Sequence, residues 1–360
     1  MTAAVLVTRP GEHRLIARAH GTPGPGQALV RVHSNGICQS DADLLRGVRP
    51  QRLVRYPVTP GHEWSGTVER VGDGVPADLL GQKVVGESIR GCRLCEPCHV
   101  DRGTLCDEGY EETGFTQPGG MAETLVVPAH SLHVLPQDAD LAAASLLEPA
   151  ALAVATVLTA KADPGESVAV LGDGVLGLLI TRFLATAGVG RVIVVGSRAE
   201  RADMARAFGA TVYVPCGEPL PGLCDVAIHT VDARATSRQV LGVLREGGRL
   251  VCTSTSPGAG TLDVVELVRR RLAVQPVLGA SSAAWSLAVR AFAEGGLDTR
   301  PLITHTFSLD AYEQALDLVA SGDCAVGKVL LTPSAQAGRT RIRPRALRSR
   351  SCGGRCWRGR

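Results

Sequence analysis

The chain lacks the long apolar runs of a membrane protein. It has 360 residues, of which 45% are hydrophobic, but it contains no stretch of roughly 20 consecutive apolar residues, the length that spans a bilayer as a helix. Residues 1–7 are too short and too uncharged for a secretory signal, and we expect an opening β-strand there. These absences favour a cytoplasmic protein with no membrane partner.

Aromatic residues are scarce, and the basic residues are unevenly distributed. The formal net charge is +3, but nine arginines and no acidic residue lie between Ser334 and Arg360, so the net charge of the remaining chain is −6. An Arg-rich tail beside a cysteine cluster would fit a nucleic-acid-binding protein. The acidic body, the 3% aromatic content and the lack of a basic helix outside the tail oppose that alternative, and we expect no nucleic-acid partner.

The apolar pattern changes near the middle of the chain. Up to about Glu148, short alternating apolar runs broken by Gly and Pro predict a β-rich domain. Beyond Pro149, apolar runs alternate with helical stretches, which predicts a doubly wound parallel sheet and an α/β fold class. Strands are expected at residues 28–33, 66–71, 123–127, 168–171, 191–195, 225–228, 249–252 and 327–331, and helices at 176–187 and 199–208.

A glycine-rich turn follows the strand expected at 168–171. Gly172, Gly174 and Gly177 form the pattern Gly-x-Gly-x-x-Gly at the start of a helix. The first glycine permits the tight turn, and the second lets the backbone approach a pyrophosphate, to which Val175 and Leu176 at the helix N-terminus present their N–H groups. The third lets helix and strand pack closely. This context predicts a Rossmann dinucleotide site; the alternative is three glycines with a structural role only.

The end of the second strand indicates which dinucleotide binds. NAD sites usually carry Asp or Glu there, which accepts hydrogen bonds from the ribose 2′-OH. Here the strand ends in Gly196-Ser197-Arg198, with no carboxylate before Glu200. Ser197 and Arg198 can donate to a 2′-phosphate, so the sequence favours NADP over NAD. The alternative is that Arg198 is solvated or stacks on the adenine, with NAD still accepted.

Four of the 11 cysteines lie in one short segment, at Cys92, Cys95, Cys98 and Cys106. In a chain without an export signal, such clustering is more typical of metal binding than of disulfides. Thiolates at this spacing can surround a tetrahedral ion and leave no open position, which predicts a structural zinc site. Free thiols or disulfides are the less favoured alternative.

Further metal-binding side chains occur earlier in the chain. Gly36-Ile-Cys38-Gln-Ser40-Asp41 and Gly61-His62-Glu63 supply a thiolate, an imidazole and a carboxylate, and Glu148-Pro149 ends the β-rich segment. Together with the cysteine array and the glycine turn, these motifs resemble the medium-chain zinc alcohol dehydrogenase superfamily, in its sorbitol and threonine dehydrogenase branch. The resemblance covers residues 1–332. More narrowly, residues 60–66 and 114–123 are similar to 2-deoxy-scyllo-inosamine dehydrogenases, which oxidise an aminocyclitol hydroxyl in aminoglycoside biosynthesis.

The resemblance implies a second, catalytic zinc, and therefore two zinc ions per chain. It assigns Cys38, His62 and Glu63 as ligands, with Glu148 binding directly or through water. Liver-type alcohol dehydrogenases have a cysteine near the position of Glu148, so the glutamate favours the polyol and amino-alcohol branch. The presence of all four residues argues against a zinc-free reductase of the same superfamily.

The resemblance also implies a domain organisation. A GroES-like catalytic domain is expected at residues 1–152 and 290–332, around a Rossmann domain at 153–289. We expect a homodimer or a homotetramer, as is common in the family. The composition of residues 333–360 predicts an Arg-rich, disordered tail.

The implied reaction is the oxidation of a secondary hydroxyl group on a small-molecule alcohol. Zinc in an open site lowers the pKa of the hydroxyl, and a hydride passes to the nicotinamide. By resemblance Ser40 begins the proton relay, but Asp43, a weaker base, replaces the family's relay histidine. Asp43 can equally be a capping or solvated residue, and Glu63 or Glu148 with a zinc-bound water offers a second route. We expect polyols, sugars or aminocyclitols as substrates first, and threonine-like amino alcohols second.

Overall fold

The computed structural model describes residues 1–197, 199–230, 240–253, 262–323 and 325–333. Arg198 and the tail expected at 333–360, apart from Pro333, therefore lie outside the described residues. Two compact units are present, one formed by Met1–Ala151 with the described residues from Gly279 onward, the other by Leu152–Leu278. No helix among the described residues is long and apolar enough to cross a membrane.

The sequence predicts that the chain returns to the first unit at residue 290, but the observed return comes earlier. The division falls at Gly279, so helix α9 (Ser282–Ala293) belongs entirely to the first unit. The reason is packing, because Trp285 on α9 is buried and stacks on His133, with ring centroids 5.7 Å apart. The Ser282 N–H and hydroxyl groups also donate hydrogen bonds to Asp101 and Glu87, respectively.

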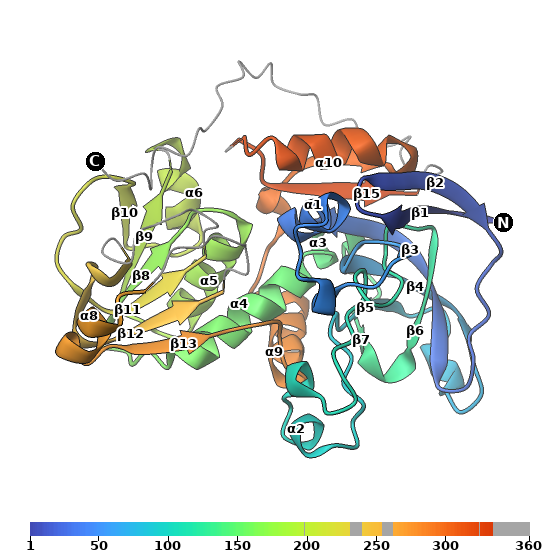
Figure 1. Ribbon diagram of the computed structural model, residues 1–360, viewed down its shortest axis with the longest axis horizontal. Coiled ribbons are helices and arrows are strands. Elements are labelled where there is room, and N and C mark those ends of the chain that lie inside the picture. Colours follow the sequence, from blue (N-terminus) through green and yellow to red (C-terminus); the bar gives the residue numbers. More distant parts are fainter. Residues whose placement is uncertain (198, 231–239, 254–261, 324, 334–360) are drawn as a thin grey trace. The chain divides into compact units, whose positions relative to one another are not determined.

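The first unit is built on antiparallel strands. A hairpin joins β1 and β2, and a seven-stranded sheet follows the order β14-β15-β3-β4-β5-β7, with β6 also paired to β3 (Figure 1). Only the β14–β15 pair in this sheet is parallel. The strands are β1 (Thr2–Arg9), β2 (Glu12–Arg18), β3 (Gln27–Ile37), β4 (Glu63–Val71), β5 (Lys83–Gly86), β6 (Thr124–Pro128), β7 (Leu132–Val134), β14 (Ile303–Ser308) and β15 (Lys328–Thr332).

Helices of the first unit connect its strands, and α4 (Leu147–Ala160) continues beyond Ala151 into the second unit. Helix α10 packs along β15 and against α1, where a core cluster includes Leu44, Phe115, Met121 and Leu331 (Figure 1). The helices are α1 (Gln39–Arg46), α2 (Glu96–His99), α3 (Leu141–Ala144), α4 (Leu147–Ala160), α9 and α10 (Tyr312–Ala320). The 3-10 turns are η1 (Gln51–Leu53), η2 (Ala77–Leu79), η3 (Gly103–Leu105), η4 (Ala129–Ser131), η6 (Arg300–Leu302) and η7 (Leu309–Ala311).

The second unit has the parallel sheet that the sequence predicted. Its six strands follow the order β10-β9-β8-β11-β12-β13, and every neighbouring pair is parallel. The elements are β8 (Ser167–Leu171), α5 (Val175–Thr186), β9 (Arg191–Gly196), η5 (Ala199–Arg201), α6 (Ala202–Ala207), β10 (Val212–Pro215), β11 (Cys224–His229), β12 (Leu244–Cys252), α8 (Val264–Arg270) and β13 (Ala273–Pro276). The predicted α/β fold class, a Rossmann sheet with a β-rich GroES-like domain, is confirmed.

Several predicted elements differ in their bounds from the observed ones. The strand expected at 28–33 continues to Ile37, and the strand expected at 66–71 begins at Glu63. The strand expected at 249–252 begins earlier, at Leu244, because β12 continues through Gly247 and Gly248 with a shift in register against β11. Gly247 has a φ of +71°, a left-handed conformation that glycine adopts without strain. The helix expected at 199–208 begins as the 3-10 turn η5 before α6.

The register of the parallel sheet brings three strand ends together. Leu171 pairs with Val195, and Gly196 pairs with Pro215, so β8, β9 and β10 end at one edge of the sheet. The glycine turn follows β8 directly. Ligands of parallel α/β sheets bind at this carboxyl edge, and the register therefore places the predicted cofactor residues there.

Candidate metal centres and dinucleotide site

Cys38 stands at the junction between a strand and a helix. Strand β3 ends at Ile37 and α1 begins at Gln39, so Cys38 is the N-cap of the helix, with extended φ and ψ of −105° and 158°. The Asp41 side chain reaches back and accepts a hydrogen bond from the Cys38 N–H at 2.9 Å. This capping interaction fixes the direction in which the Cys38 thiol projects.

His62 and Glu63 reach the same place from the start of β4. Gly36 near the end of β3 pairs with Glu63, so the antiparallel register brings the Cys38 end of β3 beside Glu63. One ligand atom from each of Cys38, His62 and Glu63 lies within 4.8 Å of the other two. The structure thus brings three of the four predicted catalytic ligands together.

Asp41 also contacts the imidazole of His62. Asp41 Oδ1 lies 3.5 Å from His62 Nδ1, and both residues are buried. Burial alone lowers the pKa of His62, but the Asp41 carboxylate and a hydrogen bond with Cys38 outweigh it and raise that pKa well above its usual value. A carboxylate beside one ring nitrogen leaves the other nitrogen for a metal, which is the common arrangement around ligating histidines.

Glu63 is paired with a lysine from the last strand. Lys328 Nζ donates to Glu63 Oε1 at 2.7 Å, and both side chains are almost fully buried. Burial by itself lowers the pKa of Lys328, but the charge of Glu63 outweighs it and raises the pKa above its usual value. Lys328 therefore already balances part of the negative charge of the Glu63 carboxylate.

Glu148 approaches the same group from the first turn of α4. Its Oε1 accepts a hydrogen bond from Ser88 Oγ at 3.1 Å, but no oxygen of Glu148 belongs to the set of atoms within 4.8 Å. Burial and the nearby charges of Glu63 and Glu112 raise the pKa of Glu148 to about 7, although His62 opposes the shift. A divalent cation among these groups would favour the carboxylate form of all of them.

Glu112 is a further buried carboxylate, and its charge interacts with those of His62 and Asp41. It forms an ion pair with Arg49 and accepts a hydrogen bond from the Tyr110 hydroxyl at 2.6 Å. The Arg49 guanidinium lies 3.5 Å from the centre of the Phe115 ring, and that ring is 5.0 Å from the ring of His62. Arg49 and Phe115 thus link Glu112 to the metal-binding imidazole.

The donor set suits a zinc ion. Thiolate, imidazole and carboxylate are the ligands of catalytic zinc sites, which keep one position open. Cys38, His62 and Glu63 each offer one such ligand atom, and these three atoms lie within 4.8 Å of one another. Cys38, His62 and Glu63 would hold the ion.

Two predicted relay residues lie on α1, immediately after Cys38. Ser40 is partly buried. The carboxylate of Asp43 accepts a hydrogen bond from Gln39 Nε2 at 3.2 Å, one helical turn away. Trp64, next to Glu63, belongs to the core cluster of β3, β4 and β6 and has a packing role.

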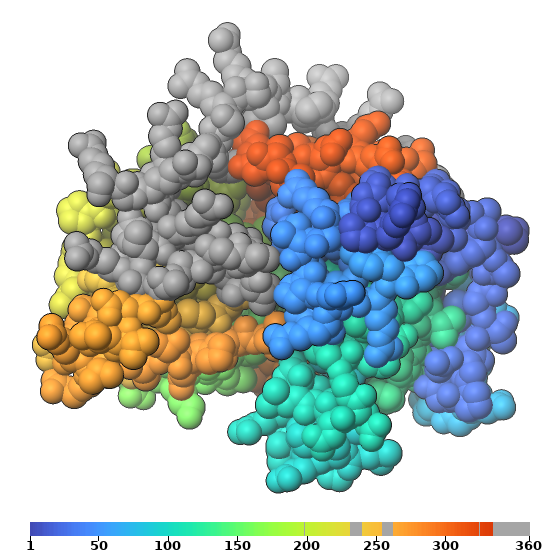
Figure 2. All heavy atoms as spheres, in the orientation of Figure 1, coloured from blue at the N-terminus to red at the C-terminus, as the bar shows by residue number. Residues whose placement is uncertain are grey.

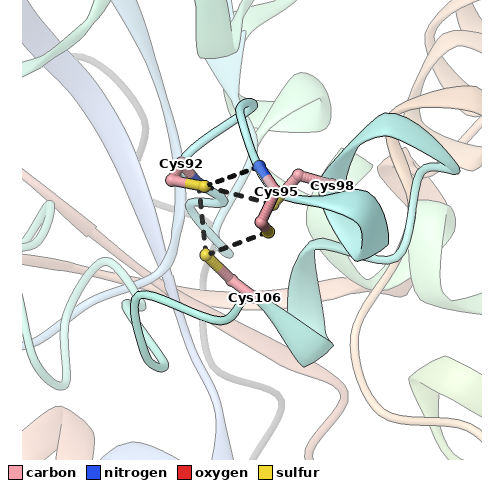
Figure 3. Close-up of side chains that lie close together, drawn as sticks. All are labelled: Cys92, Cys95, Cys98 and Cys106. Carbon is pink, nitrogen blue, oxygen red and sulfur yellow. Dashed lines mark hydrogen bonds between the residues drawn. The ribbon is translucent and has the colours of Figure 1, made fainter.

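The four clustered cysteines form a separate group in a lobe that projects from the rest of the first unit (Figure 2, cyan-green). Their sulfurs point toward one another, with Sγ–Sγ distances of 3.9 Å for Cys92–Cys98 and 4.0 Å for Cys95–Cys106 (Figure 3). Zinc–thiolate bonds of about 2.3 Å in a tetrahedron separate the sulfurs by about 3.8 Å. The spacing therefore fits one tetrahedral zinc ion.

The chemistry of this cluster also fits a cation. Burial and hydrogen bonds with the three neighbouring cysteines raise the pKa of Cys98 to about 12, although a backbone hydrogen bond from Arg93 opposes the shift. The backbone N–H groups of Leu94 and Cys95 both donate to Cys92 Sγ at 3.4 Å. None of the described cysteines forms a disulfide, so the thiols are available as ligands.

The glycine turn has the geometry of a dinucleotide site. Gly172 has a φ of +127°, and a side chain on Gly177 would collide with the Gly172 carbonyl, its Cβ lying 1.9 Å from that oxygen. Gly174 is exposed, and a Cβ there would meet no atom within 4 Å, which leaves open space above the N-terminus of α5 at Val175 and Leu176. Each glycine thus meets the requirement that the motif places on it.

At the end of β9 the predicted residues are arranged differently from the expectation. Ser197 is exposed, but its N–H and hydroxyl groups donate to the carboxylate of Asp173, at 3.0 and 3.3 Å. Arg198 lies outside the described residues. The predicted phosphate donor Ser197 is therefore already engaged by an acidic side chain.

Sequence reasoning gave no role to Asp41, Lys328, Glu112 or Asp173. Asp41 and Asp173 lie inside the motifs described above, and their acidic side chains are the signal that could identify them. Lys328 lies in the strand expected at 327–331, and nothing in its sequence neighbourhood points to Glu63. Glu112 carried no signal, because its contacts with Arg49 and Tyr110 depend on the folded chain.

Comparisons with known proteins agree with this geometry. Residues 24–137 match the alcohol dehydrogenase GroES-like domain, and residues 175–294 match the zinc-binding dehydrogenase family. The chain is 30% identical to the L-threonine 3-dehydrogenase of Anaeromyxobacter dehalogenans, over 86% of this chain and 91% of that protein.

Two solved structures extend the comparison. A zinc-binding dehydrogenase from Sinorhizobium meliloti bound to NADP has a TM-score of 0.84 and 27% identity, covering 92% of this chain and 99% of that one. A cobalt- and zinc-bound thermostable alcohol dehydrogenase from Pyrobaculum aerophilum has a TM-score of 0.82 and 28% identity, with the same coverage of both chains.

Proposed function

Because the chain belongs to the medium-chain zinc-dependent alcohol dehydrogenases, in their threonine and sorbitol branch, we propose the class of alcohol that this NAD(P)-dependent enzyme oxidises. The substrate is a polyol, sugar or aminocyclitol, and a secondary hydroxyl group becomes a ketone. The observation that carries the proposal is the convergence of Cys38, His62 and Glu63 ligand atoms within 4.8 Å. The aminocyclitol 2-deoxy-scyllo-inosamine is one candidate within this class.

The surroundings of the ligand atoms support a polar substrate. Glu63, Glu112 and Glu148 are carboxylates that lie close enough to influence one another's charge, and Ser88 and Tyr110 add hydroxyl groups. Buried carboxylates and hydroxyls make these surroundings polar, which favours a ligand with several hydrogen-bonding groups over an apolar alcohol.

The proposed reaction gives a role to each residue of the catalytic metal centre. Cys38, His62 and Glu63 hold a zinc ion that, when bound, polarises the substrate hydroxyl group. Asp41 orients His62, and Lys328 balances the charge of Glu63. Ser40 would accept the hydroxyl proton while its own hydroxyl proton passes to the next acceptor. Asp43, which is bonded to Gln39, is the weaker candidate for the next step.

The other proposed groups bind rather than react. Cys92, Cys95, Cys98 and Cys106 hold a second zinc ion that fastens their lobe. Gly172, Gly174 and Gly177 with Val175 and Leu176 hold the pyrophosphate of the dinucleotide. The preference for NADP stays a prediction from Ser197 and Arg198.

A second candidate function is the oxidation of a threonine-like amino alcohol. It is favoured by the 30% identity to a protein named L-threonine 3-dehydrogenase. A buried set of carboxylates would also suit an ammonium group. Both candidate functions use the same metal ligands, so only substrate specificity separates them.

The test is a substrate panel with a matched pair of cysteine variants. Cyclitols, aminocyclitols, polyols and threonine are each assayed with NAD and with NADP. The highest kcat/KM is expected for a polyol, sugar or aminocyclitol. Cys38→Ser should abolish turnover and leave dinucleotide binding intact, whereas Cys252→Ser, outside the proposed centres, should retain turnover.

The outcomes distinguish the two candidate substrate classes and also test the metal mechanism. A highest kcat/KM with threonine would replace the first candidate by the second. Turnover retained by Cys38→Ser would refute the assigned metal centre. Metal analysis should give two zinc ions per wild-type chain and one for Cys38→Ser.

A further inference from the structure

A carboxylate from the glycine turn lies at the end of the second strand of the parallel sheet. Asp173, between Gly172 and Gly174, is buried, with only 6% of its surface exposed. Its Oδ2 accepts hydrogen bonds from the Ser197 N–H at 3.0 Å and from the Tyr213 hydroxyl at 2.8 Å. Asp173 thus joins the residues that follow β8 to those at the ends of β9 and β10.

The space that this carboxylate fills is that of a side chain at position 196. A Cβ on Gly196 would lie 2.5 Å from Asp173 Oδ2 and 2.1 Å from the Tyr213 hydroxyl. Position 196 is the last residue of β9, where NAD-binding sheets usually carry Asp or Glu. Gly196 supplies no carboxylate, but Asp173 brings one to the same end of the strand.

Three hydrogen-bond donors at this end of β9, among the residues that the structure describes, are already engaged. Both the N–H and the hydroxyl group of Ser197 point to Asp173, and so does the Tyr213 hydroxyl. Arg201 Nη1 donates to the backbone carbonyl of Asp173 at 2.7 Å, which holds the turn against η5. A phosphate at this position would meet a carboxylate, and like charges a few ångströms apart repel strongly in a partly buried site.

We infer that Asp173 is the residue that selects the dinucleotide, and that it selects NAD by accepting hydrogen bonds from the adenosine ribose and repelling a 2′-phosphate. The inference rests on the proposed dinucleotide binding. It opposes the preference for NADP that Gly196-Ser197-Arg198 suggests, because Ser197 serves to hold Asp173. The glycine at 196 makes room for the carboxylate.

The test measures binding rather than turnover. Calorimetric titration of the full-length, zinc-loaded chain with NAD and with NADP gives two dissociation constants for the wild type and for Asp173→Asn. The wild type should bind NAD at least about tenfold more tightly than NADP, and Asp173→Asn should shift the ratio toward NADP by roughly 10- to 100-fold, the range for loss of a charged hydrogen bond. The same titration with 5′-AMP and adenosine 2′,5′-bisphosphate isolates the contribution of the ribose.

The control removes an equal charge nearby. Glu200 is exposed and follows Ser197 by three residues, and Glu200→Gln should leave the ratio of the two dissociation constants within about twofold of the wild type, as expected for a solvated charge. Tyr213→Phe, which keeps the ring but removes one donor to Asp173, should shift the ratio in the same direction as Asp173→Asn and by less.

The possible results are distinct. Equal or tighter binding of NADP by the wild type would overturn the inference without any variant and would leave dinucleotide binding intact. An equal shift in Glu200→Gln and Asp173→Asn would also overturn it, because the effect would then be general charge. Binding of neither dinucleotide would remove the proposed cofactor site itself, and the inference with it.

Discussion

Lys328 Nζ lies 2.6 Å from Glu63 Oε2, although the two residues are 265 positions apart in the chain. Their strands, β15 and β4, do not pair with each other, since both pair with β3. The ion pair crosses β3 at Gly36, where a Cβ would lie 2.3 Å from Glu63 Oε2 and 3.2 Å from the Lys328 side chain. A glycine at position 36 therefore leaves the space in which the Glu63 carboxylate and the Lys328 ammonium group meet.

Removal of the lysine charge should destabilise the first unit. In Lys328→Met, Glu63 remains buried without its partner, and the free energy of unfolding should fall by about 3 kcal/mol, the usual cost of breaking a buried pair. Urea unfolding at pH 7 measures this change. Lys161→Met, at an exposed position, should change stability by less than about 0.5 kcal/mol. Equal stabilities of the two variants would contradict the structural importance of the pair.

Asp41 should control the affinity of the centre for metal. Asp41→Asn removes the negative charge beside His62 Nδ1, and zinc affinity should fall by roughly 10- to 100-fold, as is typical when the partner of a ligating histidine is changed. Competition with a chelator measures the affinity. Asp43→Asn, on the same helix but bonded to Gln39, serves as the control and should retain the wild-type affinity. An Asp41→Asn protein that holds zinc as tightly as Asp43→Asn would rule out this role.

The cysteine lobe should depend on its own metal ion. Cys106→Ser removes one of four sulfurs, so the metal content should fall from two zinc ions per chain to one, and residues 92–106 should become a site of rapid proteolysis. Mass spectrometry of the native protein and of its limited digest gives both results. Cys252→Ser is the matched control, and a metal content of two in both variants would argue against a structural zinc.

Acid should weaken one contact of the second unit. Burial by itself raises the pKa of Asp225, but donors from Ser167 and the guanidinium of Arg245 outweigh it and lower the pKa to about 2. A carboxylate whose pKa is lowered by folding stabilises the protein above its unfolded pKa of about 3.9, and that stabilisation disappears as the pH falls toward 2.

The corresponding variant tests the sign of this effect. Asp225→Asn should lower the free energy of unfolding by about 2 kcal/mol at pH 7, and the deficit should shrink as the pH falls from about 4. Urea unfolding from pH 7 to pH 3 follows the difference from the wild type. Asp163→Asn, an exposed residue of the same unit, should show no such trend. A deficit that grows toward acid would have the wrong sign.

The parts of the site that sequence reasoning could reach are local ones. The cysteine array and the glycine turn each lie within a short segment, so residue type and spacing together carry the chemistry. Cys38, His62 and Glu63 are also recognisable, because each stands in a motif that resembles a known family. In the first two cases neighbours in the chain are also neighbours in space, whereas Cys38 meets His62 and Glu63 through the pairing of β3 with β4.

The parts that sequence reasoning missed depend on contacts between distant segments. The Lys328–Glu63 pair joins β15 and β4, whose order in the sheet is not their order in the chain. The Asp173–Tyr213 hydrogen bond joins the turn after β8 to β10, 40 positions further along the chain. Ser197 had the residue type of a phosphate donor, but only the structure reveals that its donors already have an acceptor. The residue type determines which interactions a side chain can make, and the fold determines which partner it contacts.

The position of Lys328 in the final strand has a consequence for the order of synthesis. A ribosome releases Cys38, His62 and Glu63 early, but the counter-ion of Glu63 emerges only after the entire parallel-sheet unit has been made. The ion pair at the metal-binding end of β4 therefore cannot form before the parallel-sheet unit has been translated.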